Sequence, residues 1–408
     1  MQGPRDNSFA CWARLGLALT GFVCSLAFAN DERRTIDVAV YGDAPYGTTP
    51  TDTAEFQATP AFIESVNADA DVSLVVHVGD IHSGKQYCTS AYDLSIYQLW
   101  TEFQRPLIYT PGDNEWTDCH KAGEGGGTYN KSTGQIDYVL DSNQNPVDYA
   151  KGDPLANLAL IRSIFFSEPG WTLGRRVPVI SQAFAYDRRY PSDAAFVENV
   201  LWLEGRVLFV TINVPGGSNN DQDIWYKAPS ASPTQLAEST TRTAADIRWL
   251  ESAFAAAKFF RLDAVVVVTQ ADMWDLDGTA PGGAGQAAPH LTGYESLINT
   301  IATKARDFNK PVLLFNGDSH TYRSDNPLMQ GAVCTIEPAP GQEAVPCSND
   351  DWLQHPFYSV PNFHRIVVHG STFPLEWLKL SIDPHTKAPN GASAFGPFRW
   401  QRMTQPAP

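Results

Sequence analysis

Four aspartates in this sequence each follow a glycine where a short apolar run ends, and carboxylates in such positions can bind a metal. The pairs are Gly42-Asp43, Gly79-Asp80, Gly112-Asp113 and Gly317-Asp318. A single Gly-Asp pair is a common turn dipeptide, but four that follow apolar runs favour one shared site. Carboxylates a few ångströms apart repel each other and raise one another's pKa, and a divalent cation removes that conflict. The pattern therefore predicts a divalent-metal hydrolase site.

The elements that must position these carboxylates are short runs rich in β-branched residues, which predict buried strands. They cover residues 36–41, 72–78, 106–110, 207–214, 264–269, 312–316 and 365–369, and the region 362–384 predicts two strands around Pro374. Segments with helical spacing lie between several of them, at 53–67, 93–103, 155–166, 243–259 and 294–308. Strands that alternate with helices indicate an α/β core. In such a core the carboxyl ends of neighbouring strands face one crevice, so we expect the four aspartates to converge.

Three stretches combine Gly, Pro, Asn and Ser without periodicity, which is typical of loop insertions. They span residues 120–152, 215–240 and 326–361. The sequence shows neither an internal repeat nor a break in composition strong enough to divide the chain. We therefore expect one domain over residues 30–408, with long loops around the rim of the active site.

The composition predicts a globular, exported protein. The chain has 408 residues, of which 43% are hydrophobic, enough for a large packed core. Residues 1–29 have the pattern of a secretory signal, in which two arginines precede an apolar stretch, Leu15 to Phe28, that is too short for a membrane span. The net charge of −16 argues against nucleic acid as a partner. We expect a secreted or periplasmic protein after cleavage of residues 1–29.

Four cysteines follow the predicted signal sequence, an even number that suits disulfide bonds in an oxidising compartment. Proximity in sequence predicts the pairs Cys88–Cys119 and Cys334–Cys347. A zinc site is the alternative, but the sequence has no Cys-x-x-Cys pair and disulfides are favoured.

The order of the motifs resembles that of the calcineurin-like metallophosphoesterases. The motifs are Asp43, Gly79-Asp80, Gly112-Asp113-Asn114-Glu115, Gln270 after a valine-rich strand, and Gly317-Asp318-Ser319-His320. The family carries Asp-x-His, Gly-Asp, Gly-Asn-His-Glu/Asp, a lone His and Gly-His-x-His in the same order. The match runs from about Ile36 to Pro384. The resemblance implies an α/β (α+β) fold, a four-layer β-sandwich flanked by helices, in a divergent secreted member of bacterial type.

The resemblance also implies two metal ions. The first would be held by Asp43, Asp80 and His320, and the second by Asp80, Asp113, Gln270 and Asp318. This sequence departs from the family at several ligands, because Pro45, Gln270 and Asp318 stand where the family has histidines and Asp113 replaces its asparagine. These changes enrich the site in oxygen ligands, which suit Mn²⁺ or Mg²⁺ best, with Ca²⁺, Fe and Zn²⁺ as alternatives.

The catalytic position of the family is also altered. Asn114 stands where the family's histidine protonates the leaving group, and an amide cannot act as a general acid. His82, Glu115 or a metal-bound water is the predicted substitute, with His82 favoured, or only good leaving groups are turned over. A histidine that packs within its loop is an equally good interpretation of His82. Asn213 and Arg323 are candidate contacts of a phosphate group. Local turn capping and a surface ion pair, respectively, are their alternatives.

The prediction is a metal-dependent phosphoester hydrolase, either a phosphomonoesterase or a phosphodiesterase, that acts on a small substrate with metal-activated water. A secreted relative that binds metal or ligand without catalysis is the first alternative, because the proton donor is missing. The second is a serine hydrolase that uses Ser319, since residues 317–321 fall one residue short of a nucleophile elbow. Its acid and base would come from Asp351, Asp383, His364 or His369.

Overall fold

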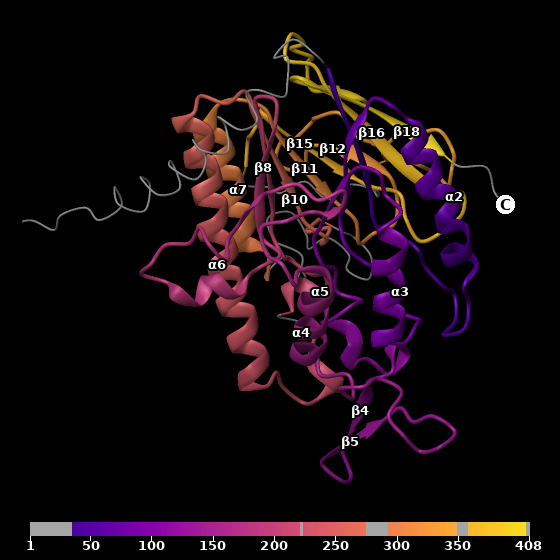
Figure 1. Cartoon of the computed structure of the whole chain (residues 1–408). Coiled ribbons are helices and arrows are strands. Elements are labelled where there is room, and N and C mark those ends of the chain that lie inside the picture. Colours follow the sequence, from indigo (N-terminus) through magenta and orange to yellow (C-terminus); the bar gives the residue numbers. More distant parts are fainter. Residues whose placement is uncertain (1–34, 221–222, 275–292, 349–357, 405–408) are drawn as a thin grey trace, which may run out of the picture.

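The computed structural model describes residues 35–220, 223–274, 293–348 and 358–404, and two mixed β-sheets dominate it (Figure 1). The signal sequence predicted at residues 1–29 lies outside the described residues. No helix within the described ranges is long and apolar enough to cross a membrane.

The first sheet has seven strands. Their order is β17 (Ala394–Phe395), β18 (Phe398–Thr404), β16 (Glu376–Ile382), β1 (Ile36–Tyr41), β2 (Val72–His77), β3 (Pro106–Tyr109) and β6 (Leu173–Gly174). The central strands β1, β2 and β3 are parallel, and β16 pairs antiparallel with β1. The three parallel strands therefore end at the same edge of the sheet.

The second sheet has nine strands. Their order is β14 (Val345–Pro346), β13 (Thr335–Ile336), β12 (Arg323–Asp325), β15 (Phe363–Val367), β11 (Val312–Asn316), β10 (Ala264–Val268), β9 (Val207–Thr211), β8 (Val200–Glu204) and β7 (Ile180–Ser181). The four neighbours β15, β11, β10 and β9 are parallel. Their carboxyl ends also share one edge.

The central strands are apolar along their whole length because both of their faces are buried. In β1, Val38 and Val40 join the core between the two sheets, while Ala39 and Tyr41 join the core under the outer helices. Alternate valines of β10 divide in the same way between the inner core and the opposite helical layer. Side chains of a strand alternate between the faces of a sheet, so a continuous apolar run indicates a strand covered on both sides.

Helices cover both outer faces of the sandwich (Figure 1). The first sheet packs against α2 (Ala54–Ala68), α3 (Ser90–Trp100) and α4 (Pro154–Phe165), and the second packs against α6 (Pro233–Phe259) and α7 (Glu295–Phe308). The layers are therefore helices, sheet, sheet and helices. This arrangement confirms the predicted α/β fold and its four-layer sandwich.

Several element boundaries differ from the prediction, and two of the differences follow from capping and register. Helix α6 begins at Pro233 instead of residue 243, because the Ser232 hydroxyl caps the backbone N–H of Gln235 and the proline occupies the first turn. Strand β15 begins at Phe363 instead of Arg365, since Phe363 pairs with Val312 of β11. Part of the loop predicted at 215–240 is therefore helical.

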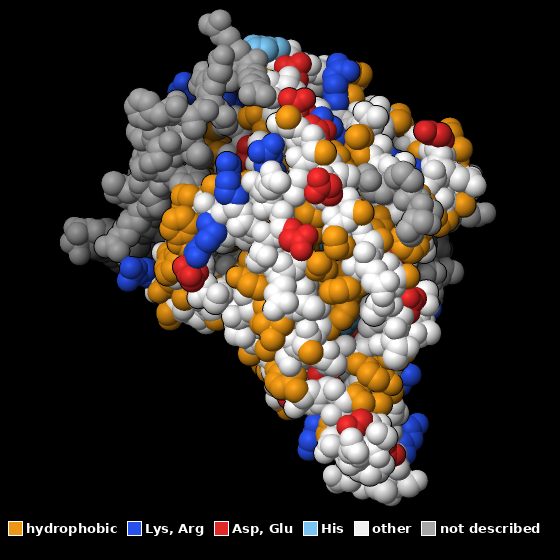
Figure 2. Space-filling model, turned by 45° about the vertical axis from the view of Figure 1, so that its right-hand side comes forward, with side chains coloured by type: hydrophobic (Ala, Val, Ile, Leu, Met, Phe, Trp, Pro, Cys, Tyr) orange, Lys and Arg blue, Asp and Glu red, His pale blue; other side chains and the backbone are white. Residues whose placement is uncertain are grey.

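The loop regions contain short elements of their own. A β-hairpin of β4 (Gly127–Asn130) and β5 (Gln135–Tyr138) projects from one end of the molecule (Figure 1). The remaining short helices are η1 (Asp118–His120), η2 (Ala122–Glu124), η3 (Pro191–Ala195), α5 (Gly216–Asn219) and η4 (Trp225–Lys227). On the face shown in Figure 2, basic and acidic side chains are interspersed with apolar ones.

Both predicted disulfides are confirmed. Cys88 is bonded to Cys119, which ties the loop after β2 to η1, and Cys334 is bonded to Cys347 beside the β13–β14 hairpin. Each bond closes a loop of the chain, and such closure restricts the unfolded state.

Candidate metal centre

The loops that follow the parallel strands of both sheets meet at one end of the sandwich. The Asp318 backbone N–H, after β11, donates a hydrogen bond to Oδ1 of Asp43, after β1, at 2.9 Å. The Gln270 amide, after β10, donates to Oδ2 of Asp80 at 3.2 Å and to Oδ1 of Asp113 at 2.9 Å. The structure therefore brings all four aspartates of the Gly-Asp pairs together.

Three of these aspartates have a left-handed backbone, which is costly for a residue with a side chain. The φ angles are 49° at Asp43, 59° at Asp80 and 76° at Asp318. Such φ values are uncommon outside glycine and gather at functional sites, where the surrounding structure holds them in place. Among the four glycines, only Gly79 has a positive φ, 109°. The left-handed residue at the Gly42-Asp43 and Gly317-Asp318 turns is therefore the aspartate.

The glycines of these pairs serve a different purpose, which is to let a carboxylate approach the backbone. A Cβ atom on Gly112 would lie 1.9 Å from Oδ1 of Asp80, and one on Gly317 would lie 2.2 Å from Oδ2 of Asp43. Both distances are far below van der Waals contact, so any side chain here would displace the carboxylate. Gly112 thus leaves room for the carboxylate of Asp80, and Gly317 leaves room for that of Asp43.

Asp43, Asp80 and His320 form a group that can hold a cation. One ligand atom from each of the three lies within 4.8 Å of the other two. Nε2 of His320 is 3.6 Å from Oδ1 of Asp43, and 38% of the histidine side chain is exposed, which opens the group to solvent. Oδ2 of Asp43 is buried and has no hydrogen-bond partner. A buried, unpartnered carboxylate oxygen is unfavourable unless a cation binds it, so these residues fit a divalent ion.

The electrostatics of the two carboxylates lead to the same conclusion. Burial, together with the negative charges of Asp113 and Glu115, raises the pKa of Asp43 to about 8. Burial and the neighbouring carboxylates also raise the pKa of Asp80 well above its usual range. Both shifts show that the ionised forms are unfavourable without a positive charge nearby. A divalent cation would supply that charge and lower both pKa values.

Tyr46 belongs to this site and was missed by the sequence analysis. Its hydroxyl donates a hydrogen bond to Oδ2 of Asp80 at 2.7 Å and accepts one from Nδ2 of Asn114 at 2.8 Å. Its ring meets the His320 ring edge to face, with 5.1 Å between centroids. The signal was the tyrosine three residues after Asp43, just beyond Pro45, the position of the family's histidine.

The other predicted ligands of a second metal are arranged differently. Nε2 of Gln270 faces Asp80 and Asp113, while its Oε1 accepts a hydrogen bond from the Gly216 backbone N–H at 2.7 Å. Oδ2 of Asp318 accepts a hydrogen bond from the Asp272 backbone N–H at 2.9 Å. Among the residues that the structure describes, neither Asp113 nor Asp318 is part of a group of three closely spaced ligands. Their ligation of a second metal remains a prediction.

The predicted substitute acids, His82 and Glu115, are both buried. His82 is fully buried, where Nδ1 faces the Ser83 carbonyl at 3.3 Å and the ring meets Tyr92, and burial lowers its pKa to about 4. Oε1 of Glu115 accepts hydrogen bonds from the Tyr109 hydroxyl at 2.5 Å and from the Gly112 N–H at 2.6 Å. These contacts favour a packing role for the histidine and a role for the glutamate in holding the Gly112 turn.

Asn213 and Arg323 are also buried. Nδ2 of Asn213 donates a hydrogen bond to Glu198 at 2.9 Å, which directs the amide into the protein. Arg323 is 6% exposed, and its Nε and Nη1 atoms are buried with no hydrogen-bond partner. Its positive charge lowers the pKa of Asp272, as does that of Arg365, although burial alone would raise it. Contact of either residue with substrate remains a prediction.

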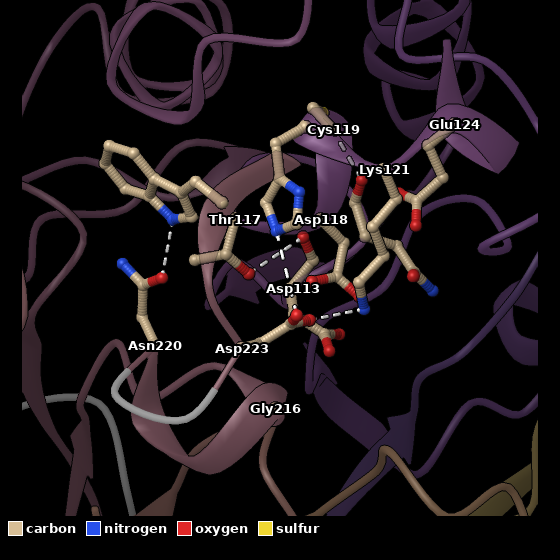
Figure 3. Close-up of polar contacts among 12 residues, drawn as sticks. Asp113, Thr117, Asp118, Cys119, Lys121, Glu124, Gly216, Asn220 and Asp223 are labelled. Atoms are coloured by element: carbon tan, nitrogen blue, oxygen red, sulfur yellow. Dashed lines mark hydrogen bonds and ion pairs between the residues drawn. The ribbon is translucent and has the colours of Figure 1, made fainter. Parts of the chain in front are cut away.

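A second group of possible ligands, Asp118, His120 and Asp223, lies beside Asp113. Figure 3 shows Lys121 directed at Asp118 and Asp223, and its Nζ is 2.7 Å from Oδ2 of Asp223. The lysine charge opposes the effect of burial on the pKa of Asp113. A protein cation therefore already pairs with both carboxylates of this second group.

The residues of a serine hydrolase do not come together in the described part of the chain. The Ser319 hydroxyl donates to Oδ2 of Asp272 at 2.9 Å. His364 contacts Ser324 and Asn390, and His369 contacts Glu337 and Thr372. Asp383 bonds to Thr386, and Asp351 lies outside the described residues. Neither His364 nor His369 is hydrogen-bonded to Ser319 in the described part of the chain.

The chain is similar in structure to several solved proteins. No protein-family model matches the sequence, and no curated protein matches it. The fold is similar to that of purple acid phosphatase PPD1 from yellow lupin (Lupinus luteus) seeds, with a TM-score of 0.40 and 12% sequence identity over 91% of this chain and 52% of that chain. The chain thus spans about half the length of that phosphatase structure. The candidate metal centre rests on the geometry of this chain's own residues.

Proposed function

We propose that this protein is a metal-dependent phosphoester hydrolase whose divalent ion is held by Asp43, Asp80 and His320. The observation that carries the proposal is the group of ligand atoms from Asp43, Asp80 and His320 that lie within 4.8 Å of one another, together with the buried Oδ2 of Asp43, which has no hydrogen-bond partner. A divalent ion bound there would supply Lewis-acid chemistry, which polarises a phosphoryl oxygen and makes water more acidic. Carboxylate ligands favour Mn²⁺ or Mg²⁺ as that ion.

The protein holds Asp80 in one orientation through several donors. Its Oδ2 accepts hydrogen bonds from Tyr46, Asn114 and Gln270, and its Oδ1 accepts one from the Asn114 backbone N–H at 3.2 Å. Hydrogen bonds to the charged form stabilise a carboxylate. The same donors fix the direction of the carboxylate, so the ligand is oriented before the cation binds.

Tyr46 is our candidate for the proton donor that Asn114 cannot be. The phenol carries a proton at the metal group, and burial together with the charge of Asp80 raises its pKa well above the usual range. A tyrosine kept in its protonated form can give its proton to a leaving alkoxide. Asn114 donates to the hydroxyl oxygen, and the O–H itself donates to Oδ2 of Asp80, so the proton would turn from Asp80 to the leaving oxygen when metal and substrate bind. Asn114, which stands at the family's catalytic position, would then contribute by orienting the acid Tyr46.

The substrate class is a small phosphoester, and the protein is exported. The His320 side chain is 38% exposed, which gives solvent and substrate access to the metal group. The two disulfides suit an oxidising compartment such as the periplasm or the extracellular space. The choice between a phosphomonoester and a phosphodiester depends on residues that contact the substrate, so the experiment includes both.

Hydrolysis assays of the full chain test the proposal. We expect turnover of p-nitrophenyl phosphate or bis(p-nitrophenyl) phosphate with Mn²⁺ or Mg²⁺, its loss in EDTA, and its recovery when metal is restored. Asp43→Asn should abolish activity, while the matched control Asp137→Asn, an exposed aspartate of the β-hairpin, should keep it. Activity that survives EDTA and is lost with a serine-directed reagent would favour the Ser319 hydrolase. Tight Mn²⁺ binding without turnover of any phosphoester would favour the non-catalytic alternative.

A further inference from the structure

The side-chain amide of Gln270 has a fixed orientation at the metal centre. Its Oε1 accepts the Gly216 backbone N–H at 2.7 Å, and its Nε2 donates to Asp113 at 2.9 Å and to Asp80 at 3.2 Å. Amide orientations are assigned from the surrounding donors and acceptors, and here every partner agrees. A backbone N–H can only donate, so a rotated amide would place NH₂ against N–H and C=O against two carboxylates.

This orientation places the NH₂ group of Gln270 between Asp80 and Asp113, where a second cation would bind. The NH₂ group has two hydrogens, and each one meets a different carboxylate, Asp80 or Asp113. The two carboxylates are therefore bridged without a metal. Because the Gln270 side chain is completely buried, it has no solvent-filled space into which to swing away.

The Gly216 backbone closes the same position from the other side. A Cβ atom on Gly216 would lie 2.2 Å from Oδ2 of Asp113 and 2.9 Å from Oδ1 of Asp318, so the loop main chain already lies against both carboxylates. Oδ2 of Asp318 is in turn engaged by the Asp272 N–H. The predicted ligands of the second metal thus have protein groups where an ion would bind.

A buried arginine holds that loop in place. Residues 217–220 all have positive φ angles, between 56° and 61°, which is a strained turn for residues other than glycine. Arg242 is fully buried, and it donates to the carbonyl oxygens of Asn213 and Asn219 at 3.1 Å each. These bonds join α6 to the chain on both sides of Gly216, so the Gly216 N–H keeps its direction toward Gln270.

We infer that the centre binds a single divalent ion, at Asp43, Asp80 and His320, and that the Gln270 amide takes the place of the second ion between Asp80 and Asp113. The inference rests on the proposed function and goes beyond it, because it sets the number of ions and assigns Gln270 as a positioning residue instead of a ligand. Glutamate at position 270 would offer a carboxylate oxygen in place of the NH₂ group. That single change should create the second ion site.

Manganese binding to the full chain tests the inference without any assay of activity. Metal analysis of metal-stripped protein after equilibration with Mn²⁺ should give one ion per chain, and the electron paramagnetic resonance spectrum should show the six lines of an isolated Mn²⁺. Gln270→Glu should bind a second Mn²⁺, with the broadened spectrum of a coupled pair about 3.5–4 Å apart. Gln182→Glu, which adds a carboxylate at another buried glutamine, is the matched control and should keep one uncoupled ion.

The outcomes separate this inference from the proposed function. Two coupled Mn²⁺ ions in the parent protein would overturn the inference and leave a metal-dependent hydrolase in place. No bound Mn²⁺ in the parent would overturn both. The stoichiometry of the parent protein is decisive by itself, so the test does not depend on the folding of Gln270→Glu. Circular dichroism and thermal unfolding of each variant show whether its metal content refers to folded protein.

Discussion

The Asp318 backbone N–H donates a 2.9 Å hydrogen bond to Oδ1 of Asp43, although the two residues are 275 positions apart in sequence. Asp43 follows β1 of the first sheet and Asp318 follows β11 of the second, so the bond links the two sheets at the metal centre. The other oxygen of Asp43, Oδ2, is buried and has no hydrogen-bond partner. The centre therefore requires both sheets of the sandwich.

Asp80→Ala should cause the largest loss of metal among single substitutions. Asp80 supplies a ligand and also collects the donors Tyr46, Asn114 and Gln270, which would all lose their acceptor. We expect metal affinity to fall by more than the roughly 10–100-fold typical of losing an outer partner of a metal ligand. Elemental analysis of dialysed protein measures the effect, and equal metal content in mutant and parent would contradict the assignment.

Tyr46→Phe should keep the metal and slow the reaction of substrates with poor leaving groups. General acid catalysis contributes about 10²–10⁴-fold, and an alkyl phosphate needs the proton more than p-nitrophenyl phosphate does. We therefore expect kcat to fall by about that factor for the alkyl ester and much less for the aryl ester. Tyr97→Phe on α3 is the control. An equal loss with both substrates would show that Tyr46 only orients Asp80.

His369→Gln should destabilise the protein most between about pH 4.5 and pH 6.5. Both histidine nitrogens face acceptors, Glu337 Oε1 at 2.6 Å and the Thr372 carbonyl at 3.2 Å. Burial alone would lower the pKa of His369, but the hydrogen bond and charge of Glu337 raise it above 6.5, with a further contribution from the charge of Glu376. In return, His369 and Arg402 hold the pKa of Glu337 below 4.5 although burial opposes them.

The direction of the pH effect follows from these two shifts. The raised pKa of His369 gives stability that is complete below about pH 6.5 and is lost as the pH rises through the folded value. The lowered pKa of Glu337 gives stability that is present above about pH 4.5 and is lost as the pH falls. Urea unfolding across this range should show a cost of about 1–3 kcal/mol near pH 6. A cost that does not change up to pH 9 would contradict the charged pair.

Removal of the Cys88–Cys119 disulfide should cost more stability than removal of Cys334–Cys347. The sequence separations are 31 and 13 residues, and the entropy of loop closure gives about 3.7 and 2.9 kcal/mol respectively. Double serine variants compared by urea unfolding measure both costs. The first variant should also lose metal, because both sulfur atoms lie against the carbonyl oxygen of Asn114, whose side chain donates to Asp80. Metal loss only in the second variant would contradict this link.

Much of the fold could be predicted because its central strands are buried on both faces. The bounds of β1 and β11 match the prediction, since an apolar run that ends in Gly-Asp marks both the strand and its end. The first part of α6 could not be found in this way. It is buried through Gln235, Ser239 and Arg242, which make hydrogen bonds to the loop at 219–220. Hydrophobic periodicity does not reveal a helix face that is buried through polar contacts.

The composition of the metal centre was partly predictable, but its orientation was not. The order of the motifs indicated which aspartates converge, because parallel strands place their carboxyl ends together. The direction of the Gln270 amide depends on the Gly216 N–H, which lies 54 residues earlier in the chain. The role of Tyr46 depends on the path of the loop after Asp43, which brings its hydroxyl to Asp80. Both are tertiary contacts that no local pattern in the sequence records.

A crystal soaked in Mn²⁺ and measured for anomalous scattering tests the central claim most directly. The account predicts one strong anomalous peak within bonding distance of Oδ2 of Asp43, a carboxylate oxygen of Asp80 and a ring nitrogen of His320. A peak at Asp118, His120 and Asp223, or no peak at the ends of β1, β2 and β11, would contradict it.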